Sequence, residues 1–212
     1  ALTAGSTAAV ALINTQVCTA SAALSWIAVE RFRDGHATTL GAVTASVDLA
    51  VDGGVALNVL DGVLVAKGDF TLALGQVRSA ALFSGNGQDA DAMTLTLSNV
   101  GIFVGVGGGL TDVGSDGDYS NDTVANGTLG FGATVTTLTL VSIKDRGASA
   151  LLATDDRTYL GVALKDFDGD LVGLDDLLVF HAYNVDAVIN KSVHADGVTA
   201  VSKLDWSTFS NT

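Results

Sequence analysis

The run Met93-Thr94-Leu95-Thr96-Leu97 alternates apolar and hydroxyl side chains, and the run Val135-Thr136-Thr137-Leu138-Thr139-Leu140 has a closely similar pattern. Successive side chains of an extended strand point to opposite faces of its sheet, so this alternation predicts strands with one apolar and one polar face. Phe70-Thr71-Leu72-Ala73-Leu74 alternates in the same way. We therefore predict a mainly β fold for residues 49–212.

Turn signals separate the predicted strands. Glycine clusters such as Asp52-Gly53-Gly54, Asp61-Gly62 and Gly85-Asn86-Gly87 are typical of tight turns. The chain contains no proline, which suits uninterrupted strands because proline cannot donate a backbone hydrogen bond.

Two β architectures remain open. Residues 72–77 (LALGQV) resemble residues 95–100 (LTLSNV), and an offset near 20 residues favours the coils of a β-solenoid. The polar positions of each strand favour an antiparallel β-sandwich or prism instead, because parallel sheets are buried on both faces.

The composition changes at Asp48, and we predict two regions, 1–47 and 48–212. Residues 1–29 carry no charged side chain, and the apolar run Thr7–Val29 is long enough to cross a bilayer as a helix. The polar centre Asn14-Thr15-Gln16 would require helical neighbours in a membrane. The first region is expected to be an apolar helix, and membrane contact is expected only if that helix spans the bilayer.

The formal net charge of −13 limits the partners. A field of this sign repels nucleic acid and anionic lipid head groups and attracts cations. Cys18 is the single cysteine, so an internal disulfide framework is excluded. The low lysine content favours an extracellular or cell-surface location.

The loop Asp116-Gly117-Asp118-Tyr119-Ser120-Asn121-Asp122 is the first candidate metal site. It places oxygen side chains at alternate positions, on Asp116, Asp118, Ser120 and Asp122. Calcium takes six to eight oxygen ligands, and a tight loop of this spacing can wrap them round one ion. The alternative is a solvated acidic turn.

A second acidic group repeats this spacing with Asp166, Asp168 and Asp170. As a loop, it would bring the three carboxylates together. As a strand, it would place them on one face, where they repel one another unless a cation lies between them. Calcium is again the predicted ion, and an Asp-Gly turn without metal is the alternative.

No catalytic spacing is present in the sequence. The histidines His36, His181 and His194 lie far apart and do not form a zinc motif. The glycine-rich run 105–109 is not followed by the Lys-Ser/Thr pair of a phosphate-binding loop. We expect a protein that is not an enzyme.

Residues 1–47 resemble an internal piece of an Amt-family ammonium transporter. The matching features are Asn14-Thr15-Gln16, Trp26, the turn with Glu30 and Gly35, and Leu40-Gly41-Ala42-Val43. The resemblance implies membrane helices. The family's pore histidine pair and aromatic gate have no counterpart here, since His36 lies in the turn.

Residues 55–192 resemble repeat units of giant, calcium-binding, adhesin-like bacterial surface proteins. The resemblance rests on runs such as LTLSNVGIFVGVGGGL (95–110) and GTLGFGATVTTLTLVSIKD (127–145). It implies a non-enzymatic structural or adhesive module of an exported repeat protein, stabilised by calcium and assembling with copies of itself or with neighbouring repeats.

Two other functions stay open. The chain is alternatively a transporter-type membrane fragment with a soluble β appendage, or a carbohydrate-binding β module that contacts surface glycans. The third reading requires exposed aromatic side chains gathered together, and Tyr159, Tyr183 and Trp206 are the candidates.

Overall fold

The computed structural model describes residues 47–83, 89–147, 151 and 153–209. The chain divides into two units, Ala1–Ala45 and Ser46–Thr212, and all described residues belong to the second. The predicted helix within residues 1–47 and the Amt-like segment therefore lie almost wholly outside the described residues. The elements are β1 (Val47–Val59), β2 (Leu64–Val77), β3 (Ala90–Val106), β4 (Gly109–Thr111), β5 (Thr123–Ala125), β6 (Leu129–Asp145), the 3-10 helix η2 (Ala153–Asp155), β7 (Arg157–Val172) and β8 (His181–His194).

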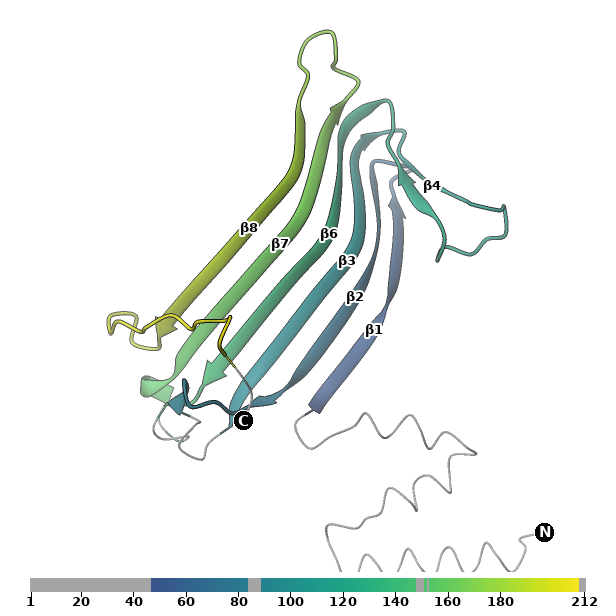
Figure 1. Ribbon diagram of the computed structural model, residues 1–212. Coiled ribbons are helices and arrows are strands. Elements are labelled where there is room, and N and C mark those ends of the chain that lie inside the picture. Colours follow the sequence, from purple (N-terminus) through teal and green to yellow (C-terminus); the bar gives the residue numbers. More distant parts are fainter. Residues whose placement is uncertain (1–46, 84–88, 148–150, 152, 210–212) are drawn as a thin grey trace, which may run out of the picture. The chain divides into compact units, whose positions relative to one another are not determined.

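Six long strands form one antiparallel sheet in the order β1-β2-β3-β6-β7-β8 (Figure 1). The short strands β4 and β5 pair with each other and form a hairpin between β3 and β6 in the sequence. The mainly β prediction is confirmed. Over the described residues the sheet is open, with free outer edges at β1 and β8.

The echo between residues 72–77 and 95–100 does not mark parallel coils. Leu72 lies opposite Leu95, and Leu74 lies opposite Met93, in antiparallel strands. The two similar runs therefore go in opposite directions along the sheet. They are alike because both strands of the pair place apolar side chains at alternate positions, on the same face of the sheet.

The strand register aligns aliphatic side chains in a row across the whole sheet. We call the face that carries this row the open face, and the opposite face, on which β4 and β5 lie, the hairpin face. The row consists of Val51, Leu72, Leu95, Leu140, Val162 and Ile189.

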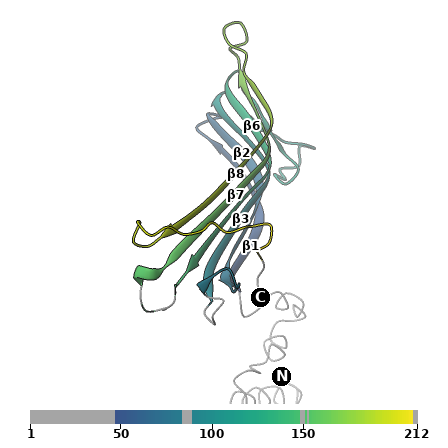
Figure 2. The ribbon, with the colours of Figure 1, turned by 60° about the vertical axis from the view of Figure 1, so that its left-hand side comes forward.

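The fully buried apolar residues of the strands all point to the hairpin face. They are Val65, Ala90, Phe103, Ile143 and Tyr159. Leu82 and Leu204 cover three of them, Ala90, Ile143 and Tyr159, and complete one core cluster. In Figures 1 and 2 the C-terminal segment that carries Leu204 crosses the sheet at the end of β8.

A buried ion pair closes the same end of the sheet. Asp145, which is fully buried, contacts the guanidinium of Arg157 and accepts hydrogen bonds from the backbone N–H of Phe83 (2.7 Å) and Gly147 (3.2 Å). The guanidinium also lies 3.4 Å from the centre of the Phe83 ring. These contacts attach the β2–β3 connection to the ends of β6 and β7.

Residues with positive φ angles interrupt the strands β3, β7 and β8 at similar positions along the sheet. Asn99, Asp166 and Asn184 have positive φ angles of 53°, 49° and 52°. The register shifts beside each of them, between Lys67 and Asp69 for the β2–β3 pair and on either side of Phe167 for the β7–β8 pair. Such bulges increase the twist and bend of a strand, and the strands bend together in Figure 1.

Candidate functional site

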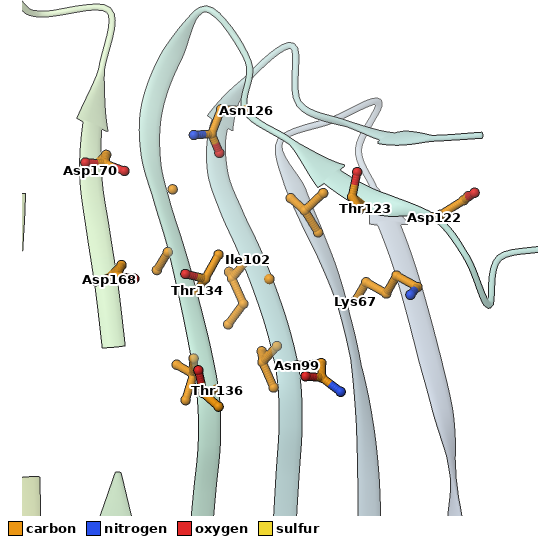
Figure 3. Close-up of a pocket in the computed structure, with 16 residues that line it drawn as sticks. Lys67, Asn99, Ile102, Asp122, Thr123, Asn126, Thr134, Thr136, Asp168 and Asp170 are labelled. Atoms are coloured by element: carbon orange, nitrogen blue, oxygen red, sulfur yellow. The ribbon is translucent and has the colours of Figure 1, made fainter. Parts of the chain in front are cut away.

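A hollow of the hairpin face lies between β7 and the β4–β5 hairpin and has a volume of about 440 Å³. Figure 3 shows Asp168 and Asp170 at one side of it and Asp122, Thr123 and Lys67 at the other. The hydroxyl and amide side chains between them belong to Asn99, Asn126, Thr134 and Thr136.

Glycines allow the hairpin to lie close to the sheet. A Cβ atom at Gly101 would lie 3.2 Å from Cγ2 of Val124, so the Val124 side chain rests directly on the backbone of β3. The side chain of Asn126 packs over Gly132 in the same way. Lys67 fixes the loop between β4 and β5, because its Nζ donates a hydrogen bond to the carbonyl oxygen of Ser120 (2.9 Å).

The predicted calcium loop, residues 116–122, lies between β4 and β5 and is stabilised by its own backbone. Oδ1 of Asp116 accepts the N–H of Asp118 (2.8 Å), and Oδ1 of Asp118 accepts the N–H of Ser120 (2.9 Å). The bond from Ser120 holds the pKa of Asp118 below its ordinary value. The loop is thus a chain of Asx turns, in which one oxygen of each of these carboxylates already accepts a backbone hydrogen bond.

Asp122 differs from the other residues of this loop. It is buried, with 4% of its surface exposed, and its Oδ1 accepts the N–H of Val113 (3.2 Å). This bond joins the two ends of the loop. Asp122 also lines the hollow, whereas Asp116, Asp118 and Ser120 do not.

The second acidic group lies within strand β7 rather than in a loop. Asp168 accepts the N–H of Asn184 at Oδ1 (2.7 Å), and Asp170 pairs with Nδ1 of His181. The N–H of Asp166 donates to Oδ1 of Asp186 (3.0 Å). Protein groups therefore supply donors to Asp168 and Asp170, which both line the hollow.

The structure brings together Asp122, Asp168 and Asp170 round one hollow, although they belong to two separately predicted sites. Within the described residues, no group of three or more His, Cys, Asp or Glu side chains is arranged so that it could hold a metal ion. The hollow is also lined by Lys67, Asn99, Asn126 and Thr134, which no local sequence pattern marks. Only the register between distant strands places them here.

The three candidate aromatic residues do not form an exposed platform. Tyr159 is buried under the core cluster, and Trp206 packs against that cluster. Tyr183 on β8 is 74% exposed. The arrangement of these residues gives no support to sugar stacking.

The described part of the chain contains no helix with the length and apolar character needed to cross a bilayer. The apolar run Thr7–Val29 lies outside that part.

Comparisons of the chain with family models, with curated proteins and with solved structures found no match.

Proposed function

We propose that this chain is a non-enzymatic structural module whose copies join edge to edge through β8 of one copy and β1 of the next. The observation that supports the proposal is that, among the described residues, nothing pairs with either outer edge of an even-numbered antiparallel sheet. With six alternating strands, β1 and β8 run in opposite directions. A second copy in the same orientation can therefore add β1 beside β8 and continue the antiparallel pattern.

The edges have the features that permit such addition. Every residue of β1 after Val47 is exposed, and so are most residues of β8. Edge strands are usually protected by proline, by lysine or by bulges. β1 has no proline and no lysine, and its register shift, between Val47 and Leu49, lies at its first residues, while β8 has Lys191 and the bulge at Asn184. The β1 edge beyond Leu49 is thus the better template for a new strand.

Joining β8 to β1 is a head-to-tail contact, which extends into an open assembly unless the rotation between copies closes a ring. Repeated addition produces a continuous ribbon, which suits a filament or surface layer. The assignment to an exported bacterial repeat protein rests on the resemblance of residues 55–192, and the glycan and calcium partners remain proposals within it.

Sedimentation velocity over a range of protein concentrations, with electron microscopy of the same samples, tests the proposal. We expect wild-type protein to form open-ended assemblies that lengthen with concentration. The double variant Ala50→Lys, Ala56→Lys places lysines on the outer strand β1, where they hinder addition of a strand. It should stop growth.

The matched control is Thr71→Lys, Thr139→Lys, which makes the same change in charge on the interior strands β2 and β6, at two positions that are not paired with each other. It should assemble like the wild type, provided that circular dichroism shows the same strand content. Wild-type protein of constant size at all concentrations would refute edge joining, as would growth of the Ala50→Lys, Ala56→Lys variant.

A further inference from the structure

The open face is apolar well beyond its central row. The neighbouring row towards the bulges contains Phe70, Leu97, Leu138 and Leu164, and the neighbouring row on the other side contains Leu74, Met93 and Leu160. Beyond the bulges the face continues with Val100, Val135 and Phe167. Large apolar surfaces of this kind on soluble proteins mark contacts with another molecule.

The described residues leave this face uncovered. None of the fully buried apolar residues of the strands points to it. Val51, Val55, Val104 and Ile189 on this face are 40%, 54%, 50% and 49% exposed. A shallow apolar groove of about 270 Å³ crosses it, lined by Val55, Leu57, Phe70, Leu95 and Ile102 among others.

We propose that the open face packs against the open face of a second copy, so that two sheets form a two-layer β-sandwich. Each copy presents the same surface, which makes the contact two-fold and closed, unlike edge joining. Facing sheets of sandwiches pack about 10 Å apart with interdigitating aliphatic side chains. The sandwich, one of the architectures that the sequence left open, would then be formed between two chains.

The size of the face suits a stable dimer. Six strands about 4.8 Å apart span about 29 Å, and 13 residues at about 3.3 Å each span about 43 Å. The face therefore measures roughly 1,200 Å² per copy, against about 800 Å² per partner in a stable interface of ordinary size.

The distribution of charge favours the same occupant. The chain carries a formal net charge of −13, so two copies repel each other wherever their carboxylates approach. The central row and the row towards the bulges contain no charged side chain. Lys191 ends the other neighbouring row on the edge strand β8, and Asp91 and Lys144 lie in the row beyond it. Asp69, Asp168 and Asp186 point to the hairpin face and thus away from the partner.

The test uses the full chain carrying Ala50→Lys and Ala56→Lys. These substitutions block edge joining, so any association that remains is due to another surface. We expect this protein to sediment as a dimer of the 21.4 kDa chain. Adding Leu140→Arg places a cation at the centre of the open face and should weaken the dimer at least about 100-fold, because an unpaired charge would be buried. Adding Thr139→Arg, the next residue on the same strand but on the hairpin face, should leave the dimer intact.

A second pair of variants guards against misfolding of the first. Val104 is half exposed, so Val104→Lys should fold, and it should also weaken the dimer, whereas Thr134→Lys on the hairpin face should not. A monomer for the edge-blocked protein at about 100 μM would overturn face pairing while leaving edge joining untouched. Equal dimerisation of the Val104→Lys and Thr134→Lys variants would also overturn it. So would flotation of the edge-blocked protein, but not of its Leu140→Arg form, with neutral phosphatidylcholine vesicles in place of dimer formation, since lipid would then be the occupant of the open face.

Discussion

The indole of Trp206 lies directly on the backbone of Gly161 in β7. A Cβ atom at residue 161 would lie 2.8 Å from Cε2 of the indole, closer than side chains normally approach. Nε1 of Trp206 donates a hydrogen bond to Oδ1 of Asn190 on β8 (3.2 Å), and the ring of Phe209 lies 5.9 Å from the indole. Gly161 is thus the position at which the C-terminal segment is attached to the sheet.

The first prediction concerns this contact. Gly161→Ala should displace the indole and lower the free energy of unfolding by about 1–3 kcal/mol, the usual cost of overpacking. Thermal and urea unfolding measure the loss. Gly53→Ala is the control, because its added Cβ would meet Phe70 at an ordinary 3.7 Å. Equal stability of the Gly161→Ala variant and the control would mean that the indole does not depend on this close approach.

The second prediction concerns the buried carboxylate. Asp145→Ala should lower the free energy of unfolding by about 3 kcal/mol, since it leaves the largely buried Arg157 without its partner. Asp89→Ala removes a surface ion pair with Arg78, in which both side chains are more than one third exposed, and should cost less than about 1 kcal/mol. Urea unfolding of both variants measures the difference. Similar losses would show that Asp145 is not important for the end of the sheet.

The third prediction concerns alkaline pH. Burial raises the pKa of the Tyr159 phenol above its ordinary value. The folded protein therefore holds this proton more tightly than the unfolded chain, and stability should fall as the pH rises above about 10.

Unfolding of the Tyr159→Phe variant between pH 8 and 12 checks this, because the variant should lack that part of the alkaline loss. Tyr183→Phe replaces an exposed tyrosine and should behave like the wild type. An identical alkaline profile for all three proteins would exclude Tyr159 as the source.

The fourth prediction concerns calcium. If the 116–122 loop binds the ion through the remaining carboxylate oxygens, added calcium raises the melting midpoint, because a ligand of the folded state stabilises it. We expect EDTA to reverse the increase and the double variant Asp116→Asn, Asp118→Asn to abolish it. The same substitutions at Asp52 and Asp69, outside the loop, are the control. Equal wild-type midpoints with calcium and with EDTA would remove calcium from the proposed function.

The strands were predictable because alternation is a local signal. Phe70–Leu74, Met93–Leu97 and Val135–Leu140 all lie in strands. The covered face was not predictable from the same signal. Alternation suggests that Leu72, Leu95 and Leu140 are buried. The fully buried side chains are instead Phe103, Ile143 and Tyr159, which lie on the opposite face. Burial depends on where the C-terminal segment and the β2–β3 connection pack, and these contacts are not local in sequence.

The candidate site likewise depends on contacts that are not local in sequence. The spacing of Asp166, Asp168 and Asp170 left a loop and a strand open. They lie in a strand, where Asp168 and Asp170 line the hollow and Asp166 does not. Their protein partners Asn184 and His181 follow from the β7–β8 pairing, which includes a register shift. Lys67 lies on β2 opposite Gly101 of β3, and nothing near it in sequence indicates that it lines the hollow.

The bulges at Asn99, Asp166 and Asn184 also define the alignment of the strands. The stretches Leu72-Ala73-Leu74 of β2 and Leu95-Thr96-Leu97 of β3 are so repetitive that sliding one past the other by two residues would match leucine with leucine again. A bulge has no equivalent two residues away, so such a slip would separate Asn99 from Asp69, to which its side-chain amide donates a hydrogen bond (3.1 Å). The irregular residues thus act as alignment marks in a sheet whose regular residues are nearly interchangeable, and they select one pairing among several of similar hydrophobic energy.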